Sequence, residues 1–222
     1  MGASRTGAPT YPVARALPIT IAAGLLGLPT LLFEFPSVAF SLVTIAWKLG
    51  TMCVLVAALR VFEKRAPDAA ALGLAPVGVS PERDRTLAAV PAVAAMLAVA
   101  FWWSQIPGLR SLSAAGNASS YGAVGALGTG VLAFELLVRY PIVVVAEESF
   151  FRGFLQPRLR TWAPVLGGVL FAIYHLQQWQ TIPSLVPFGI ALGLLRWWLG
   201  SIWPGVVFHY VGNAMFILSL RS

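Results

Sequence analysis

The chain has 222 residues, of which 58% are hydrophobic and 10% are charged, with a net charge of +7 and a mean hydropathy of +0.80. Soluble domains are about 45–50% apolar and about 25% charged, so this composition excludes an ordinary soluble protein and favours lipid surroundings. The single cysteine, Cys53, excludes an intramolecular disulfide framework. Because the basic residues lie between apolar runs instead of in one stripe, nucleic-acid binding is also disfavoured.

Several apolar segments are candidates for transmembrane helices, each of which needs about 20 mostly apolar residues. In chain order the candidates are 17–33, 38–60, 87–104, 124–148, 162–178, 185–199 and 204–220. The sequence therefore predicts an all-α, polytopic transmembrane helix bundle with about seven spanning helices. We expect residues 1–222 to form a single integral membrane domain.

The distribution of Arg and Lys residues predicts the orientation. With the N-terminus inside, most loop Arg and Lys residues fall on the inner side, and only Arg110 and Arg221 fall outside. Such an excess of basic residues is typical of inner loops. We expect a multi-pass protein of the membrane, in a bacterial inner (cell) membrane, with the C-terminus outside.

Ionisable residues inside a span are costly and mark candidate functional sites, and the predicted fourth span ends in a group of them. Glu148 and Arg152 are i and i+4, so they can pair on one helix face. Glu147 is rotated by about 100° from Glu148 and is left without that partner. A carboxylate held in a low-dielectric cavity suits general-base chemistry, although a cluster of charges at a helix end would also explain this segment.

Both histidines of the chain lie within predicted spans. His175 ends the segment that begins at Phe171, and His209 and Asn213 are i and i+4 on the seventh span. Two polar side chains on one face of a membrane helix point to a cavity or a partner. Packing of His175 and an interhelical hydrogen-bonding role for His209 and Asn213 are the alternatives.

Three further charges lie within spans. Glu135 and Arg139 are i and i+4, so we expect them to pair within the fourth span. Lys48 lies midway along the second span, where it is expected to pair with Glu135 across helices or to reach substrate.

The motifs as a set resemble the CPBP family, which contains the type II CAAX prenyl proteases and bacteriocin-processing enzymes. They are Glu147-Glu148-x-x-x-Arg152, Phe171-x-x-x-His175 and His209-x-x-x-Asn213, and the resemblance covers about 147–213. It implies an intramembrane endopeptidase in which Glu147 and His175 activate water, while His209 and Asn213 stabilise the oxyanion. Glu148, Arg152 and Phe171 would support the site.

The resemblance leaves the cofactor open. Glu147, His175 and His209 would supply the three protein ligands of a catalytic zinc site. A metal-free glutamate mechanism explains Asn213 better, because asparagine is a poor zinc ligand, and the sequence favours that mechanism over a metalloprotease. The partners expected are the lipid bilayer and a membrane-associated peptide or protein substrate, with no nucleic acid.

One conflict concerns depth in the membrane. Glu147 and His209 are predicted near the inner ends of their spans, whereas His175 lies 13 residues after the predicted start at 162, about 20 Å deep at 1.5 Å per residue. The three can meet only if residues 153–164 dip inward or the fourth span extends further. A non-catalytic membrane scaffold or immunity-type protein, and a proton-coupled transporter, remain alternative functions.

Overall fold

The computed structural model describes residues 12–32, 38–64, 66, 68, 69, 74, 128–159 and 162–219. Within these ranges all regular secondary structure is helical, as predicted. Four helical segments are long and apolar enough to cross a membrane, namely Val13–Thr30, Ala39–Phe62, Thr129–Arg158 and Trp179–Leu199. The chain is an integral membrane protein, but the predicted count of about seven spans is not confirmed, and the predicted span 87–104 lies outside the described residues.

The N-terminal part of the described chain is a helical hairpin. Helix α1 (Val13–Leu25) is followed by a 3₁₀ turn, η1 (Leu28–Leu32), and α2 (Val38–Phe62) returns beside it. Trp47 of α2 donates its indole N–H to the carbonyl of Ala23 on α1 at 2.8 Å. This hydrogen bond fixes a large aromatic side chain of α2 at the centre of the bundle, where Trp47 is buried.

A composite helix forms the middle of the bundle. It runs without a break through α5 (Thr129–Phe134), a π-helical turn η3 (Glu135–Arg139), α6 (Tyr140–Glu148), a second π-helical turn η4 (Ser149–Leu155) and a 3₁₀ turn η5 (Gln156–Arg158). The prediction that this span ends at residue 148 is therefore wrong. The charges that resembled a helix end are buried by neighbouring helices, so the helix continues to Arg158 and Glu147 lies near its middle.

The C-terminal part holds three more helices: α7 (Ala163–Tyr174), α8 (Ile182–Leu199), which follows the 3₁₀ turn η7 (Leu176–Thr181), and α9 (Trp203–Ser219). Helices α7 and α8 approach closely because glycines face the neighbouring backbone. A Cβ atom on Gly189 would lie 2.9 Å from the Cα of Gly168, and one on Gly193 would lie 2.9 Å from the Cα of Pro164. Gly200 ends α8 in the left-handed conformation, with φ of 70°.

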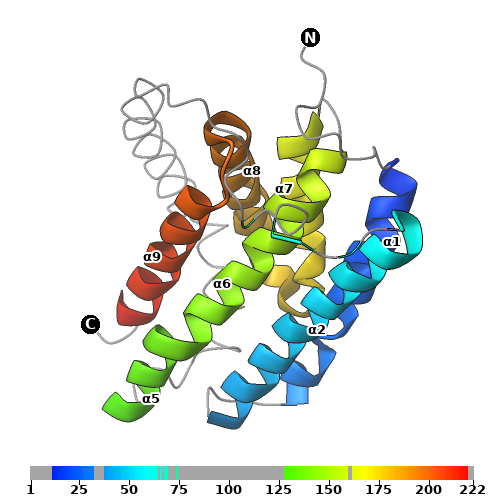
Figure 1. The fold of residues 1–222 in the computed structure, drawn as a ribbon. Helices are drawn as coiled ribbons and strands as arrows, with labels where there is room; N and C mark the ends of the chain where they lie inside the picture. The colour runs from blue at the N-terminus through cyan, green and yellow to red at the C-terminus, as the bar shows by residue number, and fades with distance from the viewer. Residues whose placement is uncertain are drawn as a thin grey trace.

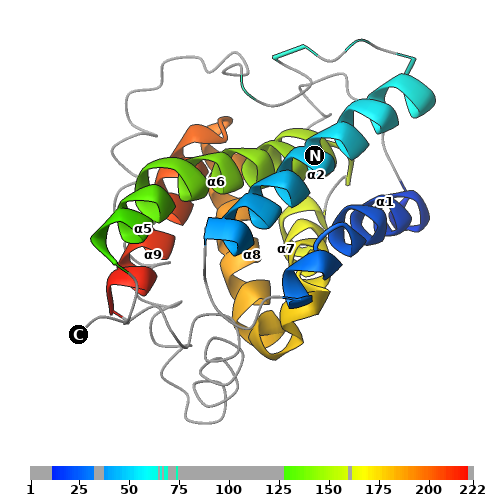
Figure 2. The same cartoon turned by 90° about the horizontal axis from the view of Figure 1, so that it is seen from below.

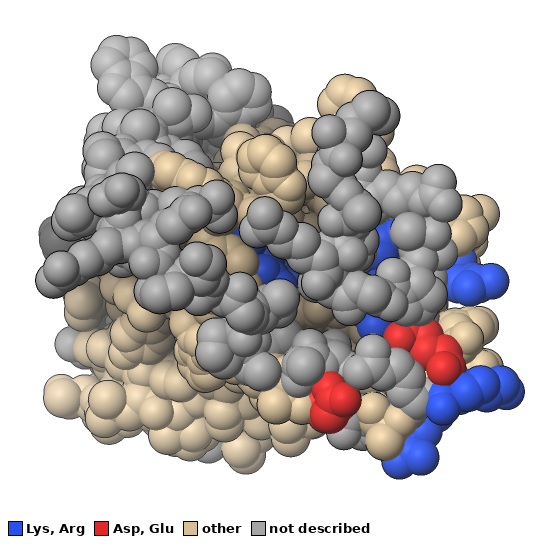
Figure 3. Space-filling view, turned by 45° about the horizontal axis from the view of Figure 1, so that its top comes forward, with Lys and Arg blue, Asp and Glu red and all other residues tan. Residues whose placement is uncertain are grey.

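The composite helix has α2 on one side and α9 on the other, with α7 and α8 packed behind it (Figure 1). The view from below shows the same order, with α1 beside α7 (Figure 2). Aromatic and aliphatic side chains of α1, α2, η4 and α7 form the main core. In the space-filling view most visible charged atoms lie on one side of the face shown, and the other described atoms there are largely uncharged (Figure 3).

Candidate active site

The three motifs meet in the interior of the bundle. Glu147 lies on α6, His175 directly follows α7, and His209 lies in the first half of α9. The Nε2 atom of His175 is 3.4 Å from Oε1 of Glu147, and the Nε2 atom of His209 is 3.6 Å from Oε2. All three are buried, with exposed fractions of 2%, 9% and 4% for Glu147, His175 and His209. The depth conflict is resolved because the fourth span extends further than predicted.

The His175 ring is held by the helix that it ends. Its Nδ1 atom lies 2.8 Å from the backbone carbonyl oxygen of Phe171, one turn earlier. A carbonyl only accepts hydrogen bonds, so Nδ1 carries a proton. The Phe171 ring also packs on the imidazole, with centroids 4.8 Å apart. The predicted supporting residue Phe171 therefore contacts His175 through both its backbone and its ring.

The His209 ring is held by Glu148. Its Nδ1 atom lies 3.0 Å from Oε1 of Glu148, and this carboxylate is fully buried. The expected pairing of Glu148 with Arg152 is confirmed, with Nε of Arg152 3.4 Å from Oε2. Arg152 in turn donates through Nη2 to the carbonyl of Gly189 on α8 at 2.9 Å. Glu148 and Arg152 thus connect His209 to the α7–α8 pair.

These contacts leave the same atom of each imidazole for chemistry. Because both Nδ1 atoms have partners, both Nε2 atoms point to the Glu147 carboxylate from different helices. An imidazole protonated at Nδ1 accepts a hydrogen bond at Nε2 when neutral and donates one when charged. The cluster can therefore accept, hold and return protons at a single carboxylate.

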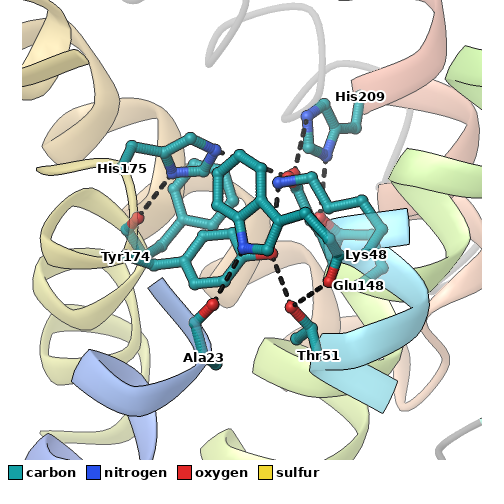
Figure 4. A network of polar contacts seen from close by, with 10 residues as sticks. Ala23, Lys48, Thr51, Glu148, Tyr174, His175 and His209 are labelled. Carbon is teal, nitrogen blue, oxygen red and sulfur yellow. Dashed lines mark hydrogen bonds and ion pairs between the residues drawn. The ribbon is translucent and has the colours of Figure 1, made fainter. Parts of the chain in front are cut away.

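Lys48 of α2 completes the cluster, and one of its two interpretations from the sequence, an ion pair with Glu135, is wrong. Its Nζ atom is 2.6 Å from Oε1 of Glu147, so Glu147 has an ionic partner and Lys48 does not pair with Glu135. Glu135 instead pairs with Arg139 as expected and accepts a hydrogen bond from Ser41. Figure 4 shows the Lys48 ammonium between the rings of His175 and His209.

Asn213 is the predicted site residue that the structure does not bring into this cluster. It lies one turn beyond His209 on α9 and is half-buried, and it takes part in none of the ion pairs and hydrogen bonds of Glu147, His175 and His209 described above. Its position on the same helix face as His209 follows from the i, i+4 spacing. A role for Asn213 therefore remains a prediction.

The residues suggested for zinc do not fit a metal site as they are arranged. In the part of the chain that the structure describes, no three His, Cys, Asp or Glu side chains are grouped so as to hold a metal ion. The ammonium of Lys48 also contacts Oε1 of Glu147, the oxygen that faces His175. A cation at that oxygen would have to displace a buried lysine side chain.

Sequence reasoning missed Tyr174 and Thr51, and misassigned Lys48. The position of Lys48 within an apolar helix was the signal for a functional role, but its partner depends on how far the fourth span extends. Tyr174 and Thr51 carry no signal in the sequence, because both side chains are uncharged and neither is a fixed position of the three motifs. The contacts from Lys48 to Tyr174 and from Tyr174 to Thr51, described below, exist only in the packed bundle.

Residues 129–215 match the family model described as type II CAAX prenyl endopeptidase Rce1-like. The chain is also 29% identical over 83 residues to the uncharacterized protein YpbD of Bacillus subtilis (strain 168), a match that covers 36% of the chain and 42% of that protein. The chain thus spans less than half the length of this relative. No solved structure matches the chain. This match supports the resemblance that the three motifs indicate, because residues 129–215 are similar to the type II CAAX prenyl endopeptidases of the CPBP family.

Proposed function

We propose that this protein is an intramembrane endopeptidase that uses Glu147 as a general base. The observation that carries the proposal is the position of the buried Glu147 carboxylate, which has an imidazole Nε2 atom at each oxygen. General-base catalysis needs a carboxylate or imidazole within reach of the attacking water and a group that can later return the proton. This cluster supplies both kinds of group in a site shielded from lipid.

In the first step Glu147 removes a proton from a water molecule, and the water oxygen attacks the carbonyl carbon of the peptide bond. His175 Nε2 orients the same water by accepting its second hydrogen. The Nδ1 hydrogen bond to Phe171 supports this role, since it leaves Nε2 as the acceptor in the neutral ring. The product of this step is a tetrahedral intermediate with one negatively charged oxygen.

His209 and Asn213 stabilise that oxygen. His209 can donate from Nε2 only when both ring nitrogens carry protons, because Nδ1 already donates to Glu148. The buried Glu148 carboxylate lies where it stabilises the positive charge of such a ring. The half-buried Asn213 amide supplies a second donor from the next turn of α9, on the face that it shares with His209.

In the last step the C–N bond breaks. Glu147 returns the proton that it took from water to the leaving nitrogen, giving an amine and a new carboxylic acid, which ionises. No metal is used in this scheme, in keeping with the contact between Lys48 and Glu147. The free carboxylate of Glu147 is then restored for the next water molecule.

The substrate class that we propose is a peptide or protein held at or in the membrane. The family description names CAAX prenyl endopeptidases, which makes a prenylated C-terminal peptide the first candidate to test. Leader peptides and C-terminal sorting signals are the next. We further propose a bacterial inner (cell) membrane as the location; YpbD, to which the chain is similar, is a bacterial protein.

The test is hydrolysis by the purified protein in proteoliposomes, with an internally quenched farnesylated peptide ending in a Cys-aliphatic-aliphatic-X sequence. A single turnover in H₂¹⁸O should place one ¹⁸O atom in the new carboxylate of the peptide and none in Glu147, as measured by mass spectrometry. Incorporation into Glu147 during that turnover would show attack by the carboxylate itself and contradict the general-base role.

A scaffold or a transporter predicts a different result. Neither would cleave the farnesylated peptide, a leader peptide or a sorting-signal peptide, whatever the state of Glu147. Comparison of membrane proteomes from cells with the wild type and with Glu147→Gln gives the wider test. A set of new peptide ends that depends on Glu147 supports the proposal, and identical peptide ends in both cultures would contradict it.

A further inference from the structure

Lys48 contributes to the candidate site from outside the matched segment. It lies on α2, whereas residues 129–215 carry the family motifs. Its exposed fraction is 2%, and its ammonium is 2.6 Å from Oε1 of Glu147. Within the candidate site it is the group that brings a positive charge from α2 to the proposed general base.

A directed chain of hydrogen bonds holds this ammonium. Lys48 Nζ donates to the Tyr174 hydroxyl at 3.1 Å, and that hydroxyl lies 2.9 Å from Oγ1 of Thr51. Thr51 donates its own hydrogen to the Trp47 carbonyl at 3.1 Å. The Tyr174 hydroxyl must then donate to Thr51 and accept from Lys48, so the direction of each of these hydrogen bonds is fixed.

Two aromatic rings form the walls around the ammonium. Lys48 Nζ lies 3.2 Å from the centroid of the Trp47 ring and 4.4 Å from that of Tyr174, and these rings stack with centroids 4.9 Å apart. Ring faces attract cations, most strongly where water is excluded. Trp47 is itself fixed, since its indole donates to Ala23, and a Cβ atom on Gly27 would lie 2.7 Å from its ring.

We infer that Lys48 is a positioning residue for the reaction, which holds Oε1 of Glu147 and thereby fixes the carboxylate between His175 and His209. The inference rests on the proposed function. A buried carboxylate needs a compensating charge, and Lys48 supplies it without offering a proton acceptor that would compete for the water. The aromatic walls and the Tyr174–Thr51 chain restrict the ammonium to one place.

The kinetic test compares Lys48→Met, Lys48→Arg and the matched control Glu63→Gln. Methionine keeps the length of the side chain and removes its charge, whereas Glu63 pairs with Arg158 in another buried ion pair of the α2 region, with Nε 2.5 Å from Oε1. We expect Lys48→Met to lower kcat by about 10²-fold with little change in KM. Lys48→Arg should recover part of this loss, and Glu63→Gln should leave kcat per folded molecule unchanged.

A spectroscopic test observes the Lys48 ammonium directly and needs no substrate. The spectrum is simple because the chain has two lysines, Lys48 and Lys64. Side-chain ¹⁵N-lysine NMR should give two ammonium signals, of which the Lys48 signal is shifted by the ring currents of Trp47 and Tyr174. The substitution Glu147→Gln should move the Lys48 signal and leave that of Lys64 in place. A Lys48 signal that does not respond would overturn the inference.

The two proposals fail in different ways. If Glu147→Gln is inactive but Lys48→Met keeps the kcat of the wild type, the positioning role is wrong and the proposed function stands. The same holds if Lys48→Met and Glu63→Gln lower only the yield of folded protein. If the wild type cleaves none of the three peptide classes, the proposed function and the positioning role are both overturned, even where NMR shows the Lys48–Glu147 contact.

Discussion

Glu135 and Glu147 are two buried carboxylates on one composite helix, and they differ in the origin of their partners. Glu135 pairs with Arg139 four residues later and accepts one hydrogen bond from Ser41 of α2. Glu147 is contacted by charged or titratable groups from three other helical elements: Lys48 of α2, His175 at the end of α7, and His209 of α9.

Burial does not distinguish the two carboxylates, since their exposed fractions are 1% and 2%. The chemistry of the partners does. A guanidinium stays protonated, so Glu135 and Arg139 remain a charged pair that takes part in no proton transfer. Two imidazoles beside Glu147 can exchange protons with it. A buried charge inside a membrane thus indicates a reaction only when titratable groups from elsewhere reach it.

The largest expected effect separates the two carboxylates directly. We expect Glu147→Gln to lower kcat by about 10³-fold, because the amide cannot take a proton from water. Glu135→Gln should keep kcat per folded molecule within about 2-fold of the wild type. Cleavage of the farnesylated peptide by each purified variant measures both values, and equal losses would remove the functional distinction between the two sites.

The structural role of Glu135 should appear in the stability of the protein and not in kcat. Glu135→Gln leaves Arg139 buried without its carboxylate, which should lower the free energy of unfolding by about 3 kcal/mol. Unfolding by SDS titration in mixed micelles measures the change. The control is Tyr210→Phe, which removes one hydrogen bond to the Leu136 carbonyl on the same composite helix. A Glu135→Gln variant as stable as the wild type would contradict the structural role.

A smaller effect is expected for the carboxylate behind His209. Glu148→Gln keeps an oxygen that can accept from Nδ1 but removes the charge that stabilises a protonated His209 ring, so kcat should fall by about 10²-fold, as for the loss of one oxyanion donor. The control Tyr210→Phe changes the residue next to His209 and should keep kcat. If kcat of Glu148→Gln is unchanged, His209 does not act as a charged donor.

The smallest effect concerns the packing behind the site. A Cβ atom on Gly168 would lie 2.6 Å from the backbone nitrogen of Ile190, so Gly168→Ala should cost about 1–3 kcal/mol in unfolding free energy. Gly167 is the matched control, since a Cβ atom there meets nothing within 4 Å. Gly167→Ala should raise stability by up to about 1 kcal/mol through helix propensity. Equal effects on SDS unfolding would contradict the close contact.

Local features could be predicted from the sequence. The pairs of Glu135 with Arg139 and of Glu148 with Arg152 follow from i, i+4 spacing on a helix, and both are confirmed. The membrane class follows from composition, and the resemblance to the CPBP family follows from three spaced motifs. These inferences need no knowledge of where a helix ends or which helices are neighbours.

The partner of Lys48 could not be predicted, because it depends on the depth of each residue along two helices. Ending the fourth span at 148 placed Glu135 opposite Lys48, and the extension to Arg158 places Glu147 there instead. The π-helical turn from Ser149 to Leu155, which carries the chain past the charges, has no clear sequence signature. The orientation in the membrane stays a prediction.

The route of the chain through this cluster has a consequence for biosynthesis. Residues are added from the N-terminus, so Lys48 and Glu147 enter the membrane before His175, and His209 follows on α9. Until α9 is inserted, Oε2 of Glu147 and the buried carboxylate of Glu148 lack the imidazole that contacts them. In the proposed mechanism, a nascent chain that stalls before α9 would carry the base without its oxyanion donor, so cleavage would require the assembled helices.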